Sequence, residues 1–313
     1  MSPERMSPIK IGLVGVGKIA RDQHLPVIAA NPDYELVAVA SRNATLDGVD
    51  SYGSLDAMLD ARPEIEAVAL CTPPQGRHAL ARHALQRGVH VLLEKPPGAT
   101  LAEVHDLVDF AKGKSLALLA TWHSRYAPAV EPARAWLAGR TLKSVTVSWK
   151  EDVRHWHPGQ EWIWQPGGLG VFDPGINALS IITHILPRAL VLKAATLEFP
   201  ANRQAPIAAQ LDFQDLAGVP VRAEFDWRQT GPQSWDIVVE TTDGTLTLNR
   251  GGAAMSIDGV AHLEEPEAEY ANLYALFSRL VREGRVDVDL APLSHVADAF
   301  LCGHRVLVEE FHD

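Results

Sequence analysis

The chain has 313 residues, 47% of them hydrophobic, and a formal net charge of −11 at pH 7. This length favours two domains, and no apolar run reaches the roughly 18 residues that cross a membrane. Scattered lysines and arginines in an acidic chain lack the basic face that binds nucleic acid, so we expect neither a nucleic-acid nor a membrane partner. The N-terminus does not resemble a signal peptide, and Cys71 and Cys302 do not suggest a disulfide framework. We therefore expect a cytoplasmic protein in which both thiols are buried.

Runs rich in Val, Ile, Leu and Ala alternate with amphipathic stretches from Ile9 to about Thr121. This alternation is typical of βαβ units, and near-continuous apolar runs predict strands covered on both faces. Thr100-Leu-Ala-Glu103 has a capping-box pattern that predicts the start of a helix. We expect a doubly wound parallel sheet, a Rossmann domain, in residues 1–122. Its predicted strands are Ile9 to Val14, Leu36 to Ala40, Ala67 to Leu70, Val89 to Leu93 and Leu116 to Ala120.

Residues 123–313 have a different pattern of apolar and polar residues, with longer predicted strands of alternating polarity. This pattern predicts an α+β domain with a large, mostly antiparallel, open-faced sheet, and Asp243-Gly244 predicts a hairpin turn. The expected strands are Leu142 to Lys150, 190–199, 207–215, 219–228, 235–241 and 244–249. The expected helices are Ala127 to Leu137, Gly170 to Leu186, Glu267 to Arg282 and Ala291 to Glu310.

The segment Gly15-Val16-Gly17-Lys18-Ile19-Ala20 follows the first predicted strand and opens a helix. In that context Gly15 permits the tight turn, Gly17 lets the backbone approach a pyrophosphate, and Ala20 keeps the helix close to the strand. The segment therefore predicts a dinucleotide site. In the alternative interpretation, the glycines serve packing alone.

The end of the second predicted strand indicates which dinucleotide binds. An NAD site would place Asp or Glu there, whereas this chain has Ser41-Arg42-Asn43. Arg42 could pair with a 2′-phosphate and Ser41 could add a hydrogen bond, so we expect NADP as the preferred cofactor and NAD as the alternative. An ordinary solvated arginine is the other interpretation of Arg42.

Four motifs, read in order, resemble the Gfo/Idh/MocA oxidoreductase family over essentially the whole chain. They are the glycine turn, Thr72-Pro73, Val91-Leu-Leu-Glu94-Lys95-Pro96, and Gly167-Gly168 through Asn177. Glu94-Lys95-Pro96-Pro97, Thr121-Trp-His-Ser-Arg125 and Asp173-Pro-Gly-Ile-Asn177 further resemble the members that oxidise the free aldoses L-arabinose and D-galactose at C1. The resemblance implies hydride transfer from the anomeric carbon to a nicotinamide cofactor, giving an aldonolactone.

Lys95, Asp173 and Asn177 are the predicted catalytic residues. A lysine at the carboxyl end of a strand lies where doubly wound sheets bind ligands and acts as an acid/base when its pKa is lowered. The resemblance implies a histidine four residues after Asp173, but this chain has Asn177 at that position. An asparagine cannot exchange protons near neutrality, so we expect Lys95 to act as the acid/base. In the other interpretation, Asp173 is a structural acid near a helix end.

The remaining site residues come largely from the resemblance. The predicted cofactor contacts are Gly15, Gly17, Lys18, Ile19, Ser41, Arg42, Thr72, Pro73, His78, Glu94 and Lys95. The predicted substrate contacts are Lys95, His123, Glu151, Trp156, Asp173, Asn177 and Trp235. Tryptophans beside polar groups suit the flat faces and hydroxyl rims of sugars, whereas we expect Trp162 and Trp164 to be core or interface residues.

The sequence is compatible with three alternatives. His155, His157 and Glu151 could form a zinc site, although the resemblance implies no metal. The enzyme could act on an inositol, a sugar phosphate or a non-sugar, or the chain could be a non-catalytic sensor that binds NADP and sugar. The resemblance also implies a homo-oligomer, dimer or tetramer, formed through the open sheet, whose exposed face would otherwise leave a large apolar patch in water.

Overall fold

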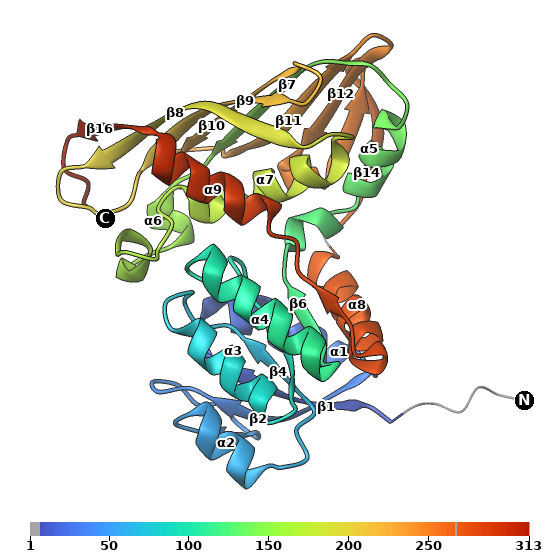
Figure 1. Ribbon diagram of the computed structural model, residues 1–313, viewed down its shortest axis with the longest axis vertical. Coiled ribbons are helices and arrows are strands. Elements are labelled where there is room, and N and C mark those ends of the chain that lie inside the picture. The colour runs from blue at the N-terminus through green and yellow to red at the C-terminus, as the bar shows by residue number, and fades with distance from the viewer. Residues whose placement is uncertain (1–6, 267, 313) are drawn as a thin grey trace, which may run out of the picture. The chain divides into compact units, whose positions relative to one another are not determined.

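The computed structural model describes residues 7–266 and 268–312, which form two compact units (Figure 1). The second unit begins at Trp122, close to the expected boundary, but Tyr270–Asp289 belongs to the first unit rather than to the second. This segment contains helix α8 (Glu269–Glu283), and it belongs to the first unit because the apolar side chains along one side of the helix, including Tyr274 and Phe277, are buried. Strand β15 (Val286–Asp287) then extends the first sheet by pairing with β6 (Leu118–Ala120).

The described residues of the first unit hold a seven-stranded sheet of order β15-β6-β5-β4-β1-β2-β3, and every pairing is parallel. The doubly wound prediction is confirmed, and the five expected strands are present with small shifts at their ends. The short strands β3 and β15 were not expected, since neither carries an apolar run. The remaining strands are β1 (Ile9–Val14), β2 (Tyr34–Ala40), β3 (Asp50–Tyr52), β4 (Ala67–Leu70) and β5 (His90–Leu93).

Helices connect the parallel strands, and Figure 1 shows α3 and α4 beside one another over the sheet. The Thr100 hydroxyl accepts the Glu103 N–H while the Glu103 carboxylate accepts the Thr100 N–H, so the predicted capping box is confirmed. The helical segments are η1, a π-helical turn (Ala20–His24), α1 (Leu25–Ala30), α2 (Leu55–Ala61), α3 (Arg77–Gln86) and α4 (Leu101–Lys114).

The described residues of the second unit hold a nine-stranded sheet of order β14-β13-β12-β11-β7-β10-β9-β8-β16. Only the β7–β10 and β8–β16 pairs are parallel among these strands, so the mostly antiparallel prediction is confirmed. The Asp243-Gly244 hairpin joins β11 to β12, with Thr241 opposite Gly244. The strands are β7 (Leu142–Lys150), β8 (Leu190–Pro200), β9 (Ala208–Asp215), β10 (Pro220–Asp226), β11 (Ser234–Thr241), β12 (Gly244–Asn249), β13 (Ala254–Ile257), β14 (Val260–Glu264) and β16 (His304–Val308).

Helices of the second unit lie along one face of this sheet (Figure 1). Inward positions such as Val145, Val147 and Trp149 are buried, as the alternating pattern of β7 requires. The helical segments are η2 (His123–Tyr126), α5 (Val130–Leu137), α6 (Val153–Trp156), η3 (Glu161–Trp164), α7 (Phe172–Ile185), η4 (Arg250–Gly252) and α9 (Ala291–Cys302).

The centre of the opposite face of the sheet is polar, where an apolar patch was expected. Its central strands carry Lys150, Glu224, Arg222 and Asp212, which form ion pairs of 2.7 Å and 3.2 Å along the face. Charged pairs of this kind remain hydrated and need no covering partner. The apolar-patch argument for an oligomer therefore does not apply to these central strands, and the oligomeric state stays a prediction that rests on resemblance.

The end of the chain also differs from expectation. The helix expected from Ala291 to Glu310 stops at Cys302, and after Gly303 the segment β16 pairs with β8. A Cβ on Gly303 would lie 2.4 Å from the Ala299 carbonyl oxygen, so this close turn requires glycine. Cys302 is exposed at the helix end and Cys71 is partly exposed, so the prediction that both thiols are buried is wrong.

The expected helix start at Glu267 lies outside the described residues, and α8 begins at Glu269. Within the described ranges, no helix combines the length and apolar character needed to cross a membrane.

Candidate functional site

The glycine turn connects β1 to the helical segment that contains η1. Gly15 has φ +93°, and a Cβ there would lie 3.0 Å from the backbone of Cys71 and Thr72, so only glycine fits. A Cβ on Gly17 would meet nothing within 4 Å, which leaves open space above its backbone. Ala20 is fully buried, as expected for a helix packed closely against its strand. The turn therefore has the tight bend and the accessible backbone that a pyrophosphate site needs.

Backbone hydrogen bonds align the carboxyl ends of the neighbouring strands with this turn. The Gly15 N–H donates to Ala40 O at 2.8 Å, and the Cys71 N–H donates to Val14 O at 2.8 Å. The Glu94 N–H donates to Leu70 O at 3.2 Å, which continues the same edge of the sheet. Residues that follow β2, β1, β4 and β5 consequently lie along one edge, as the predicted cofactor contacts require.

Two side chains on this edge are suited to a ligand. The Thr72 hydroxyl oxygen is buried and has no hydrogen-bond partner in the part of the chain that the structure describes. Arg42 is exposed just after β2 and forms no hydrogen bond or ion pair with any described residue. A buried orphan hydroxyl and an available guanidinium both fit a phosphate-bearing dinucleotide.

Other predicted cofactor residues have partners within the protein. Lys18 pairs with Asp22 one helical turn later, and His78 Nε2 lies 2.8 Å from Asp106 of α4. Ser41 is partly exposed, and its backbone N–H donates to Tyr52 O at 2.9 Å. Ile19 is partly exposed and Pro73 is exposed on the same edge.

Lys95 follows β5 in a turn whose geometry Glu94 helps to set. The Lys95 N–H is 3.0 Å from Glu94 Oε2 and 3.1 Å from Thr121 Oγ1. Glu94 is only 4% exposed, and its Oε1 lies 2.9 Å from His24 Nε2. Tyr270 donates its hydroxyl hydrogen to the same Oε1 at 2.8 Å. The residue before the predicted acid/base is therefore the centre of a buried polar network.

Sequence reasoning missed His24 and the two tyrosines of this network. His24 is fully buried, and its Nδ1 is 2.7 Å from the Tyr274 hydroxyl. Burial by itself lowers the pKa of His24, but Cys71, Tyr274 and the Glu94 carboxylate together raise that pKa well above its ordinary value. Burial also raises the pKa of Tyr274 to about 12.

Arg77, also missed, holds the other side of the Lys95 turn. Arg77 is 2% exposed, and its guanidinium donates to the carbonyl oxygens of Glu94 and Pro96. It also donates to Thr72 O, with Nε at 3.0 Å. Arg77 thus ties the turn that carries Lys95 to the segment after β4.

In the second unit, Asp173 and Asn177 lie one turn apart on the same side of α7. Asp173 is 3% exposed, and its Oδ2 lies 3.3 Å from Nε2 of His157. The His157 ring packs against Trp227, with 5.3 Å between ring centroids. His157 reaches Asp173 from the end of α6, so an imidazole faces this carboxylate even though Asn177 stands where the resemblance led us to expect a histidine.

Glu151 lies between two tryptophans. Trp227 Nε1–H donates to Oε1 at 3.1 Å and Trp235 Nε1–H donates to Oε2 at 2.8 Å, and Glu151 is only 4% exposed. Trp235 also packs against Trp156, with 5.3 Å between centroids, and stacks on Trp149 at 6.0 Å. These contacts gather Glu151, Trp156 and Trp235, and through Trp227 and His157 they extend to Asp173.

The last predicted substrate residue, His123, is in η2, where its Nδ1 pairs with Glu269. Trp164 is buried against Trp227 and Trp162 donates to Gln160 Oε1 at 3.2 Å. Among the described residues, no three histidine, cysteine or acidic side chains converge as a metal site would require, so the geometry gives the zinc alternative no support.

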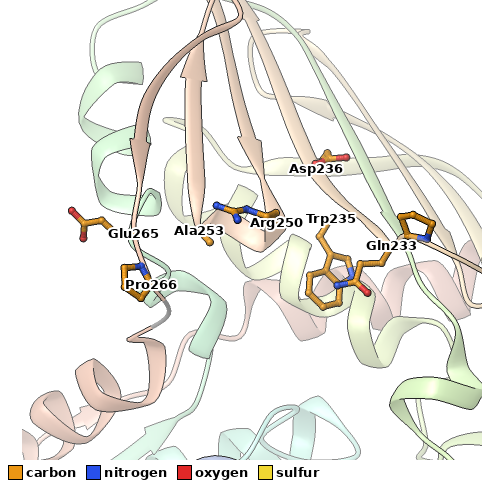
Figure 2. Close-up of a pocket in the computed structure, with 8 residues that line it drawn as sticks. Gln233, Trp235, Asp236, Arg250, Ala253, Glu265 and Pro266 are labelled. Atoms are coloured by element: carbon orange, nitrogen blue, oxygen red, sulfur yellow. The ribbon is translucent and has the colours of Figure 1, made fainter.

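Trp235 also borders a cavity of about 580 Å³ in the second unit (Figure 2). Its lining combines this aromatic ring with charged and amide side chains at the ends of β11 to β14. The lining residues are Pro232, Gln233, Trp235, Asp236, Arg250, Ala253, Glu265 and Pro266. Of the predicted substrate contacts, only Trp235 belongs to this lining.

The parallel sheet, the glycine turn and the aligned strand ends define a dinucleotide-binding Rossmann domain joined to a second, sheet-based unit. Residues 9–121 match the GFO_IDH_MocA oxidoreductase family, described as having an NAD-binding Rossmann fold. Together with 51% identity to a curated dehydrogenase over 98% of this chain, this match establishes that the chain belongs to the Gfo/Idh/MocA family. The chain is therefore an oxidoreductase that acts on CH–OH donors.

Three similar proteins extend this assignment. A galactose 1-dehydrogenase of Pseudomonas fluorescens is 51% identical over 98% of this chain and 100% of its own length. The crystal structure of a D-galactose-1-dehydrogenase from Rhizobium etli is 62% identical, with a TM-score of 0.95 over 99% of each chain. A 3-ketoreductase from Actinomadura kijaniata, crystallised with NADP and TDP-benzene, shares the fold at 20% identity, with a TM-score of 0.85 over 96% of this chain and 99% of that chain.

Proposed function

We propose that the protein is an aldose 1-dehydrogenase that oxidises D-galactose, and L-arabinose as a second substrate, with NADP preferred over NAD. The observation that carries the proposal is the full-length similarity, at 51% and 62% identity, to two proteins named galactose 1-dehydrogenases. The residues of both units support this activity independently.

The cofactor preference rests on the edge of the first sheet. Exposed Arg42 lacks a partner among the described residues, and Ser41 stands where an NAD site would have an acid. A guanidinium forms strong, charge-assisted hydrogen bonds with a 2′-phosphate. The orphan Thr72 hydroxyl and the open backbone at Gly17 fit the rest of a dinucleotide. When bound, the nicotinamide supplies the hydride acceptor.

Lys95 takes the proton of the anomeric hydroxyl in this proposal. Its backbone is held by Glu94, Thr121 and, through the adjoining carbonyls, Arg77. A base held in one position loses little entropy when it reaches its proton. In the second unit, Asp173 accepts hydrogen bonds from sugar hydroxyls and Asn177 both donates and accepts them.

The aromatic cluster supports a sugar as the substrate. Trp156 and Trp235 offer apolar faces for the C–H side of a pyranose, and Glu151 orients the Trp235 ring through its indole N–H. Polar and aromatic groups in one cluster are typical of pockets for small polar ligands.

Steady-state kinetics test the proposal directly. NADP reduction should be measured with D-galactose, L-arabinose, D-glucose and myo-inositol, and each active sugar should be repeated with NAD. We expect the highest kcat/KM for D-galactose with NADP. Lys95→Ala should abolish turnover while NADP binding stays nearly intact, with Lys193→Ala on β8 as the control. Turnover of an inositol alone, or binding of NADP and galactose without turnover, would contradict the proposal.

A further inference from the structure

We infer that His24 is a positioning residue for the reaction: together with Tyr270 it fixes the Glu94 carboxylate, and through that carboxylate the backbone of Lys95. The inference rests on the proposed function, because it takes Lys95 as the acid/base. It adds three residues, His24, Tyr270 and Tyr274, none of which belongs to the predicted site.

Lys95 stands where the ladder of β5 has ended, and its N–H is held by side chains. Its two acceptors are Glu94 Oε2 at 3.0 Å and Thr121 Oγ1 at 3.1 Å. The orientation of the Glu94 carboxylate therefore helps to set where the backbone of Lys95 lies, together with Thr121 and Arg77.

The two oxygens of Glu94 have different contacts. Oε2 receives the Lys95 N–H, whereas Oε1 receives the Tyr270 hydroxyl at 2.8 Å and faces His24 Nε2 at 2.9 Å. An ionised carboxylate only accepts hydrogen bonds, so Nε2 carries a hydrogen toward Oε1. Donors on Oε1 oppose rotation of the carboxylate and so keep Oε2 on the Lys95 N–H.

His24 is itself held in one orientation. Its Nδ1 lies 2.7 Å from the Tyr274 hydroxyl, and its ring is edge-on to Tyr270 and Tyr274 at 5.1 Å and 5.7 Å between centroids. Tyr34 donates its hydroxyl hydrogen to Tyr274 O at 2.7 Å, which fixes that part of α8 against β2. A fully buried ring with both nitrogens engaged has little freedom to turn.

This arrangement joins the two functional turns of the first unit. His24 ends η1, in the helical segment that starts at the glycine turn, and Glu94 precedes Lys95 after β5. The position of the acid/base is thereby linked to the helix whose N-terminal turn would face the cofactor. Catalysis is sensitive to displacements of about 1 Å caused by residues remote from the chemistry.

The experiment compares His24→Ala, His24→Gln and Tyr270→Phe with a matched control, His90→Gln. His90 occupies the opposite end of β5, where its Nδ1 accepts the Ala117 N–H at 2.9 Å. A glutamine in place of His24 keeps an amide N–H near Oε1, and Tyr270→Phe removes a single oxygen, so these variants remain informative if His24→Ala fails to fold.

We expect His24→Ala and Tyr270→Phe to lower kcat about 10- to 100-fold while the Kd of NADPH changes less than about threefold. His24→Gln should recover most of the lost kcat, and His90→Gln should keep kcat within about twofold of the parent. If the network were merely structural, the variants would lose thermal stability without a selective fall in kcat at nearly constant Kd of NADPH. The inference is overturned if His24→Ala or Tyr270→Phe keeps kcat at the level of the control.

A second measurement separates this inference from the proposed function. Lysines are dimethylated with ¹³C-formaldehyde, and the Lys95 resonance is assigned by NMR with Lys95→Arg. We expect the Lys95 resonance to shift in His24→Ala and Tyr270→Phe but not in His90→Gln. If no aldose is oxidised, the proposed function fails while a shift still supports the positioning role. An unchanged Lys95 resonance in both variants overturns that role.

Discussion

His157 Nε2 lies 3.3 Å from Asp173 Oδ2, although the two residues belong to different elements, the end of α6 and the first turn of α7. The resemblance to the family leads to the expectation of a histidine on α7 itself, at the position that Asn177 occupies in this chain. The carboxylate therefore retains an imidazole neighbour from another part of the chain, in an environment where Asp173 is 3% exposed.

His157→Phe should lower kcat/KM for the sugar about tenfold, the effect of losing one charge-assisted contact of about 1.5 kcal/mol. Phenylalanine keeps an aromatic ring against Trp227, so the change in kcat/KM reports the loss of the Nε2 contact with Asp173 alone. Steady-state kinetics against His184→Phe, at the far end of α7, measure the effect. Equal kcat/KM in both variants would show that the contact has no part in turnover.

Gly15 and Gly17 should respond to substitution in opposite ways. Gly15→Ala should cost about 1–3 kcal/mol of stability, since its φ of +93° and its close backbone neighbours both oppose a Cβ. Gly17→Val should leave the unfolding free energy nearly unchanged and weaken NADPH binding more than about tenfold, because the space it fills is where the pyrophosphate would lie.

Urea unfolding and fluorescence titration of NADPH distinguish these effects. Tight NADPH binding by Gly17→Val would show that the open space is not a cofactor site. Gly15→Ala serves as the comparison, because its defect arises in the fold itself.

Arg42→Ala should lower kcat/KM with NADP about 10- to 100-fold, the loss of hydrogen bonds from a guanidinium to a phosphate. The same variant should keep its kcat/KM with NAD within about twofold, because NAD has no 2′-phosphate. The NAD reaction is thus an internal control for folding. An equal loss with both cofactors would contradict the role assigned to Arg42.

Local patterns were sufficient to predict the parallel strands, the capping box and the Asp243-Gly244 hairpin. Each depends on residues near one another in the chain, such as Thr100 and Glu103. The glycine turn was recognisable for the same reason. The strand β16 was missed because its apolar residues follow α9 after only Gly303, and a helical period could be extended through them.

The buried networks could not be predicted, because their partners are distant in sequence. His24 meets Glu94 across 70 positions and Tyr274 across 250 positions. No spacing rule links such residues, and a lone histidine in a helical segment gives no signal of its own. The sequence singles out His157 only as a possible zinc ligand, and its proximity to Asp173 emerges only when the segment after α6 folds against the start of α7.

The stability of the first unit should depend on pH through His24. Its pKa is raised above the ordinary value of about 6.5 by Cys71, Tyr274 and Glu94, against the lowering effect of burial. The folded protein therefore holds this proton at pH values where the unfolded chain has lost it. Its contribution is fully present below about pH 6.5 and declines as pH rises through the raised pKa.

Urea unfolding of the parent and of His24→Gln between pH 6 and 9 measures this contribution. The stability difference between the two proteins should shrink steadily as the pH rises above about 6.5. Tyr274 stays neutral over this range, because its pKa is raised to about 12. A difference that is constant, or that grows with pH, would contradict the assignment.

Glu151→Gln should destabilise the second unit by about 1–3 kcal/mol, although it changes only one oxygen into an amide nitrogen. Both carboxylate oxygens accept an indole N–H, at 3.1 Å from Trp227 and 2.8 Å from Trp235, so an amide must present a donor to one of them. Displacement of the Trp235 ring should also raise the KM for the sugar.

A double-mutant cycle with Trp227→Phe tests the cause, with urea unfolding as the measurement. The phenylalanine variant has no indole N–H, so the amide nitrogen of the introduced glutamine can turn toward that side and leave its oxygen for Trp235. The stability cost of Glu151→Gln should therefore be smaller in the Trp227→Phe background, by about 0.5–3 kcal/mol. An equal cost in both backgrounds would show that the two indole contacts do not hold the carboxylate, and that Glu151 does not orient Trp235.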